Sequence, residues 1–218
     1  MSATGLSDVR RADDFYETPA WCTKAILGEL RTPNGWAADQ RTPIPLTTRI
    51  ALDPCAGRGA ILDVLRDSGR FETIAGIELR EEHAIRAIES SRSFAPSLRY
   101  AIEIRDALDP DRTWGKPDLI VMNPPFKLAM QFIERALVEI LPRGLGRPGD
   151  VAALLRLNWL GSQGRAAFHR RYPADIFVMP RRPSFTGDGA TDSIDYAWFV
   201  WGEGRGNRWQ ILDVEERV

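Results

Sequence analysis

The residues best suited to chemistry are Asn123, Pro124, Pro125 and Phe126, which directly follow the apolar run 119–122. Two consecutive prolines have no backbone N–H to donate, and each restricts φ to about −65°. The side-chain oxygen of Asn123 and the carbonyl of Pro124 can each accept one hydrogen of a planar amine, and Phe126 offers a ring face for an attached base. Although Asn and Pro also form ordinary turns, this tetrapeptide predicts a rigid, acceptor-only corner that binds and activates an amine.

Acidic residues end three predicted strands that precede this corner. Asp53 opens the loop 53–60 between a strand and a helix, and Glu78 and Asp106 end the next two strands. At these positions Glu78 could bind both hydroxyls of a ribose, and Asp106 could accept a hydrogen bond from an adenine amine. Ligands of open parallel sheets bind at the carboxyl ends of the strands, so these side chains are expected to meet around one ligand.

The loop 53–60 contains a short Gly57-Arg58-Gly59 element. Glycines allow a ligand to approach the backbone, and the N-terminus of the following helix offers N–H donors. The spacing lacks the third small residue of the dinucleotide fingerprint, which disfavours a nicotinamide oxidoreductase.

The elements that must position these residues alternate between β-rich runs and amphipathic stretches. The predicted helices are 60–67, 81–90, 128–140 and 164–171, and the predicted strands are 49–52, 73–78, 99–104, 119–122, 151–157, 176–179 and 197–201. This alternation predicts an α/β, Rossmann-like fold with a mostly parallel sheet and helices on both faces.

Composition limits the remaining possibilities. The chain has 218 residues, a net charge of −1 and two cysteines, which suit one compact domain in a reducing compartment and exclude a zinc or disulfide framework. No leader or apolar span is recognised, so a cytoplasmic protein without a metal is expected. The near-neutral charge argues against a polybasic binder, although local basic clusters remain possible.

At this point the chain resembles the class I S-adenosylmethionine-dependent methyltransferases, and within them the small bacterial and phage-type enzymes that methylate adenine N6 in DNA. The resemblance implies a seven-stranded sheet whose last strand is antiparallel. It assigns the catalytic role to Asn123, Pro124, Pro125 and Phe126. The cofactor-binding residues that it implies, including matches in the N-terminal segment, are Tyr16, Thr18, Pro19, Asp53, Cys55, Ala56, Gly57, Gly59, Glu78, Leu79, Asp106, Ala107 and Asn123.

The resemblance covers most of the chain, including the segments 154–160 and 195–201, but lacks a separate target-recognition domain. It implies one domain over 1–218, with 1–48 as a cofactor-contacting segment and loop, and leaves loops 31–48 and 161–192 to contact DNA. A duplex adenine would be flipped out of the stack and methylated by direct displacement. A monomer or weak dimer is expected.

Substrate contacts are predicted from aromatic and basic residues near the corner. Phe126, Trp159 and Phe185 could stack on a base, and Arg165 belongs to an arginine-rich stretch, 165–182, that could contact phosphates. A packed core position for Trp159 and a solvated surface for the arginines are the simpler alternatives.

Other functions stay open. The same corner occurs in enzymes that methylate RNA amines or a glutamine side-chain amide, and a non-catalytic subunit that binds S-adenosylmethionine is a further alternative. Cytosine N4 methylation is less favoured, because Ser or Asp is more frequent there at the position of Asn123. Cys55 follows a proline, as the nucleophile of cytosine-C5 methyltransferases does, but it lies in the expected cofactor loop, which favours a packed thiol.

Overall fold

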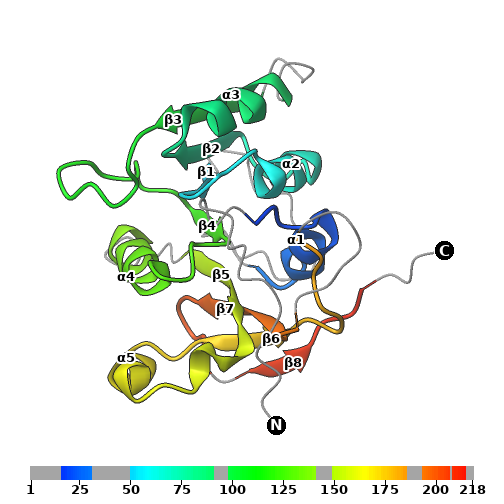
Figure 1. Ribbon diagram of the computed structural model, residues 1–218, viewed down its shortest axis with the longest axis vertical. Helices are drawn as coiled ribbons and strands as arrows, with labels where there is room; N and C mark the ends of the chain where they lie inside the picture. The colour runs from blue at the N-terminus through cyan, green and yellow to red at the C-terminus, as the bar shows by residue number, and fades with distance from the viewer. Residues whose placement is uncertain are drawn as a thin grey trace, which may run out of the picture.

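A computed structural model describes residues 16–30, 50–90, 98–140, 149–185, 193–206 and 208–214. Their strands form one eight-stranded sheet in the order β3-β2-β1-β4-β5-β7-β6-β8 (Figure 1). The strands are β1 (Ile50–Asp53), β2 (Thr73–Glu78), β3 (Arg99–Ile104), β4 (Leu119–Met122), β5 (Asp150–Arg156), β6 (Asp175–Val178), β7 (Tyr196–Trp201) and β8 (Trp209–Ile211).

The strand directions confirm the predicted mostly parallel sheet. β7 pairs antiparallel with both β5 and β6, whereas the other pairings are parallel. The predicted count of seven strands was wrong, because β8 adds an eighth strand beside β6. This strand has only three residues, of which Trp209 and Ile211 are exposed, so the sequence contains no buried apolar run that predicts it.

Alternating side chains give the central strands two buried faces. In β7, Tyr196, Trp198 and Val200 pack into one core, while Ala197, Phe199 and Trp201 pack into the other. Successive side chains of a strand point to opposite faces, so a strand with apolar residues throughout requires cover on both sides. The aromatic residues of this strand are accordingly all buried.

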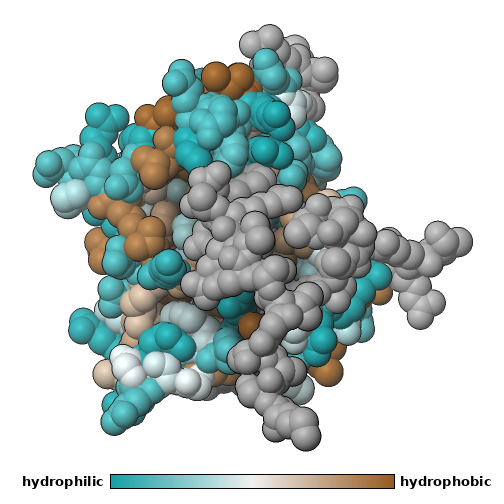
Figure 2. Space-filling model, viewed as in Figure 1, coloured by the Kyte–Doolittle hydropathy of each residue, from teal (hydrophilic) through white to brown (hydrophobic). Residues whose placement is uncertain are grey.

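Helices cover both faces of the sheet (Figure 1). α1 (Ala20–Leu27) and α2 (Ala60–Asp67) contribute to the first core, and α4 (Ala129–Ile140) and α5 (Ala166–Arg171) to the second. α3 (Glu81–Ser90) contacts β2 and β3, and hydrophilic side chains gather over this end of the molecule (Figure 2). Two 3-10 turns, η1 (Leu157–Leu160) and η2 (Gln163–Arg165), precede α5.

A buried ionic cluster lies at the amino ends of β5 and β6, the two strands that flank β7. Arg205, which follows β7, pairs with Asp150 at the start of β5 and with Asp175 at the start of β6, at 3.0 Å for Asp175. All three side chains are at least 92% buried. Arg205 also donates to the carbonyl of Glu29 at 2.7 Å, so the cluster ties the end of the α1 segment to the sheet.

No helix in the described part of the chain has the length and apolar character needed to cross a bilayer. Over the same residues, no group of three or more His, Cys, Asp or Glu side chains is arranged to hold a metal ion.

Candidate functional site

A cavity of about 740 Å³ opens at the carboxyl ends of β1, β2, β3 and β4. The strand order reverses here, because β2 and β3 extend the sheet on one side of β1 and β4 lies on its other side. Such switch points leave a crevice between the loops, which is where open α/β sheets bind ligands. The predicted residues that line it are Tyr16, Thr18, Asp53, Cys55, Ala56, Gly57, Glu78, Leu79, Asp106, Ala107, Asn123, Pro124, Pro125 and Phe126.

The loop after β1 is held in place by the end of β2. The Ala56 N–H donates to the carbonyl of Ile77 at 2.9 Å, and the Gly57 N–H donates to Glu78 Oε2 at 2.7 Å. Glu78 Oε1 accepts from the Arg80 N–H at 2.9 Å. Each carboxylate oxygen has a second lone pair, so Glu78 organises this loop and still has acceptor capacity toward the cavity.

Asp53 is a buried carboxyl group in the cavity wall. It is only 1% exposed, and its Oδ1 accepts from the Cys55 N–H at 3.0 Å. Burial raises the pKa of Asp53 from its ordinary value to about 7, against the opposing effect of the hydrogen bonds from Cys55. A cation in the cavity would favour the ionised form, so this site is electrostatically prepared for a positively charged ligand.

The ends of β2 and β3 add apolar and acidic surface. Leu79 is 68% exposed beside the cavity, while Ala107 is buried. Asp106 is exposed, and its Oδ1 accepts from the Leu108 N–H at 2.8 Å. An exposed leucine next to a carboxylate suits a planar, polar-edged ring system, which would cover the apolar surface and leave its edge to hydrogen-bond.

The side-chain amide of Asn123 is fixed by the N-terminal segment. Its Nδ2 donates to Thr18 Oγ1 at 3.0 Å and to the carbonyl of Tyr16 at 3.3 Å. A carbonyl oxygen can only accept, so the nitrogen must be the amide atom that faces Tyr16. The acceptor Oδ1 therefore lies on the opposite side of the amide, and Asn123 itself lines the cavity.

Cys55 joins the loop after β1 to the corner after β4. Its thiol donates to Asp53 Oδ1 at 3.4 Å, and the backbone N–H of Asn123 is close enough to lower its pKa in part. Burial raises the pKa of Cys55 well above its usual value, and the neighbouring carboxylate of Asp53 raises it further. A thiol that resists ionisation is a poor nucleophile, which agrees with its predicted packing role.

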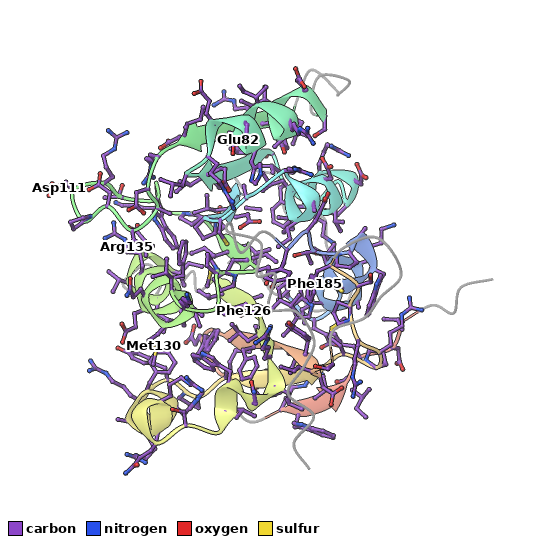
Figure 3. The ribbon with its side chains drawn as sticks, viewed as in Figure 1. Glu82, Asp111, Phe126, Met130, Arg135 and Phe185 are labelled. Carbon is purple, nitrogen blue, oxygen red and sulfur yellow. The ribbon has the colours of Figure 1, made fainter. Side chains whose placement is uncertain are left out.

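The ring of Phe126 is already in contact with other side chains. The guanidinium of Arg156 lies 4.1 Å from its centroid, and the ring of Tyr16 lies 5.5 Å away. Tyr16 in turn contacts Phe185, at 5.7 Å between ring centroids, and Figure 3 shows Phe126 and Phe185 in the middle of the molecule. A base that stacks on Phe126 would share this surface with Arg156.

Two predicted cofactor residues do not line the cavity within the described structure. Pro19 precedes α1, and its carbonyl accepts from the Cys22 N–H at 2.9 Å. Gly59 adopts a φ of 89°, and a side chain there would lie 3.1 Å from Ala87 and 3.2 Å from the Tyr100 hydroxyl. Gly59 therefore permits close packing of α2 against α3 and β3, and this packing leaves no space for a ligand where a Gly59 Cβ would lie.

Three predicted substrate-binding residues are also absent from the described cavity lining. Trp159 is 8% exposed and packs edge-on against Phe168 and Phe199, with centroids 5.9 and 5.5 Å away. Arg165 donates to the Trp159 carbonyl at 2.7 Å and lies over its ring. Phe185 reaches the site through Tyr16. Substrate contacts by these three residues stay predictions.

The cavity also contains residues that the sequence reasoning missed. Several of these additional residues are sequence neighbours of predicted positions, and Gln131 and Phe132 come from α4. The additional residues with a positive charge are Arg58, Arg80, Arg105 and Lys127. The helical stripe of α4 indicated its buried face but could not show that its first turn borders the corner. The predicted substrate loop 31–48 and most of the stretch 183–192 lie outside the described residues.

Solved structures with this arrangement of strands and helices exist at low sequence identity. A protein named a "predicted O-methyltransferase" from Agrobacterium tumefaciens aligns with a TM-score of 0.55 and 20% identity, over 88% of this chain and 83% of its own. A SAM-dependent methyltransferase from Methanosarcina mazei gives 0.51 and 13%, over 76% and 94%. A protein provisionally named an RNA methyltransferase, from Pyrococcus horikoshii, gives 0.55 and 14%, over 72% and 75%.

No protein-family model and no curated protein matches the chain. The strand order, the antiparallel β7 and these structural neighbours together define its fold, which is that of the class I methyltransferases.

Proposed function

We propose that this protein transfers the methyl group of S-adenosylmethionine to the exocyclic N6 amine of adenine in DNA. The observation that carries the proposal is the orientation of the Asn123 amide, whose nitrogen is bound by Thr18 and Tyr16. Its oxygen is thereby reserved as an acceptor at the edge of a cavity whose other walls suit a nucleoside with a cationic group.

The cavity residues fit S-adenosylmethionine at both of its ends. Asp53 matches the positive charge of the methionine part, because a cation would relieve the cost of ionising this buried carboxyl group. Glu78 would accept from the ribose hydroxyls, and Leu79 and Asp106 would contact the adenine. When bound, this group supplies a methyl on a sulfonium, whose S–C electron pair returns to sulfur as the methyl passes to a nitrogen.

The corner after β4 would manage the amine. Asn123 Oδ1 and the Pro124 carbonyl would each accept one N–H, which draws the nitrogen lone pair out of conjugation with the base and makes it available for attack. These acceptors bind more strongly as the nitrogen gains positive charge, so they favour the transition state. After transfer the nitrogen gives one proton to water, and no strong base or nucleophilic cysteine is needed.

Adenine in DNA is favoured as the substrate by the residues that carry the resemblance to small DNA methyltransferases: Asn123 to Phe126, Tyr16 to Pro19, and the segment that ends β5. An RNA amine is the second candidate, because the corner accepts any planar amine and one structural neighbour with a TM-score of 0.55 carries an RNA methyltransferase name. Arg58, Arg80 and Arg105 line the cavity, and their positive charge suits either nucleic acid.

The test is nucleoside mass spectrometry after incubation of wild type and Asn123→Ala with S-adenosylmethionine. Duplex DNA, single-stranded DNA and total RNA serve as parallel substrates, and calorimetry with S-adenosylhomocysteine checks that the variant still binds the cofactor product. We expect N6-methyldeoxyadenosine from the wild type and its loss in Asn123→Ala. Methylation confined to RNA would replace the DNA proposal, and methylation that survives Asn123→Ala would reject this corner as the catalytic site.

A further inference from the structure

Asn123 depends on its neighbours for the orientation of its amide. The terminal torsion of an asparagine side chain is broad and nearly two-fold, so an unrestrained amide can present either its oxygen or its NH2 group to a ligand. An NH2 group turned toward the cavity would repel a substrate amine, because both partners would be donors. The chemistry proposed for this site therefore requires that one orientation be strongly preferred.

Thr18 is built to impose that orientation. It is 4% exposed, and its Oγ1 accepts from Asn123 Nδ2 at 3.0 Å, which is shorter than the 3.3 Å bond to the Tyr16 carbonyl. As a β-branched residue, threonine loses little rotamer freedom when its hydroxyl is held at a fixed position. A short bond from a buried, stiff side chain is well suited to positioning.

The segment that carries Thr18 is itself anchored. It leads directly into α1, where the Cys22 N–H bonds the Pro19 carbonyl at 2.9 Å. The buried indole of Trp198 in β7 donates to the Cys22 carbonyl at 3.0 Å. Thr18 is thus fixed relative to the sheet that also carries Asn123. The hydrogen bond between Asn123 and Thr18 therefore joins two segments that are both held in place by the sheet.

We infer that Thr18 is a positioning residue for methyl transfer, whose hydroxyl holds the Asn123 amide with its oxygen toward the substrate amine. The inference rests on the proposed function for its kinetic consequence. It adds to the role expected for this residue, since Thr18 lines the cavity and its predicted contact with the cofactor stays a prediction.

Two substitutions separate the hydroxyl from the shape of the side chain. Thr18→Val keeps the branched shape and removes the acceptor, whereas Thr18→Ser keeps the acceptor. Thr23→Val is the matched control, because Thr23 is fully buried in the neighbouring α1 and its Oγ1 has no hydrogen-bond partner among the described residues. Thermal unfolding of all three variants verifies that they fold.

The kinetic measurement uses the nucleic acid that the wild type methylates. We expect Thr18→Val to lower kcat about 10- to 100-fold with less than about a twofold change in the Kd of S-adenosylhomocysteine, because a small misplacement costs rate and not cofactor affinity. Thr18→Ser should recover kcat to within about threefold, and Thr23→Val should match the wild type. A Thr18→Val variant that loses cofactor affinity with an unchanged kcat would overturn the inference.

An activity-independent measurement keeps this test distinct from that of the proposed function. The side-chain NH2 signals of Asn123, assigned by comparison with Asn123→Ala, report its hydrogen bonds by NMR. We expect Thr18→Val to shift these signals and speed their hydrogen exchange, while Thr18→Ser leaves them close to the wild type. Signals that Thr18→Val leaves unchanged would contradict the positioning role, even if no nucleic acid proves to be a substrate.

Discussion

The buried carboxyl groups at the two ends of the sheet differ in whether a cationic side chain is bonded to them. At the amino ends of β5 and β6, Asp150 and Asp175 are each 2% exposed, and Arg205 forms an ion pair with both. At the carboxyl end of β1, Asp53 is 1% exposed, and the structure records no cationic side chain bonded to it in the described residues. Its pKa is accordingly raised to about 7.

The difference separates a structural end from a binding end. Removing a partner from a buried ion pair leaves an uncompensated charge, so the Arg205 cluster contributes to stability only as long as it is complete. Asp53 resembles a buried carboxyl group whose cationic partner has been removed, and ionising it lowers the stability of the fold. We propose that a ligand with a positive charge is the partner of Asp53, and variants at each end test this asymmetry.

The largest effect is expected at the structural end. Arg205→Met removes the guanidinium that pairs with both Asp150 and Asp175 and should lower the free energy of unfolding by about 3–5 kcal/mol. Urea denaturation measures this change. Arg208→Gln is the control, because the pair that Arg208 makes with Glu29 at 2.9 Å is partly exposed, with side chains 49% and 25% accessible, and should be worth less than about 1 kcal/mol. Equal stability of Arg205→Met and wild type would remove the contrast between the two ends.

At the binding end, the stability of the protein should depend on the protonation of Asp53. The folded protein retains this proton up to about pH 7, whereas the unfolded chain releases it near the ordinary aspartate pKa of 3.8. The contribution of this group to the free energy of unfolding is therefore fully present below pH 3.8 and is lost as the pH rises toward 7. Urea melts across this range measure the trend.

Asp53→Asn isolates that contribution. The amide oxygen can still accept from the Cys55 N–H, but the group no longer titrates. Relative to wild type, the variant should gain stability as the pH rises to 7 and lose affinity for S-adenosylhomocysteine, whose ammonium group lacks its counter-charge. A variant that binds this ligand as tightly as wild type would show that Asp53 is not the partner of the cation.

A smaller effect is expected for Glu78→Gln. The carboxylate accepts from both the Gly57 and the Arg80 N–H groups, and a glutamine can offer its single oxygen to only one of them. Hydrogen bonds to charged groups contribute about 1.5–3 kcal/mol, so the Kd of S-adenosylhomocysteine should rise roughly 10- to 100-fold by calorimetry. Asp106→Asn keeps the acceptor for the Leu108 N–H and should change the Kd less.

The smallest effect is expected for Arg156→Lys, whose guanidinium lies over the ring of the cavity residue Phe126. A lysine keeps the charge but cannot lay a flat guanidinium on the Phe126 ring, a contact worth about 0.5–2 kcal/mol. We expect the KM of the nucleic acid to change by severalfold in steady-state kinetics, with an unchanged Kd for S-adenosylhomocysteine. A change in cofactor affinity instead would mean that Arg156 acts on the loop after β1.

Local patterns predicted the central part of the fold well. α2 and α3 have the bounds that their helical periodicity indicated, and β2, β3 and β4 match their predicted ranges. The cavity could be anticipated for the same reason, since residues that follow parallel strands must meet at one edge. α1 was not predicted, because Pro19 offers no side-chain cap and residues 20–27 fell within the segment 1–48 that was assigned to cofactor contacts.

Contacts between distant segments could not be predicted from these patterns. The bond between Asn123 and Thr18 spans 105 residues, and the placement of Arg156 over Phe126 depends on how β5 lies beside β4. Trp159 illustrates the same limit, because its aromatic neighbours come from α5 and β7. Periodicity indicates that a residue is buried, but the identity of its partners follows from the tertiary packing.

The position of Cys55 in the cavity wall allows its chemical labelling to report whether the cavity is occupied. Only two cysteines are present, and Cys22 has no exposed surface, so an alkylating reagent that enters the cavity would label Cys55 alone. The raised pKa of this thiol makes the labelling slow and strongly dependent on pH. A molecule that fills the cavity should therefore lower the rate of Cys55 labelling measured by mass spectrometry, even when that molecule is not a substrate.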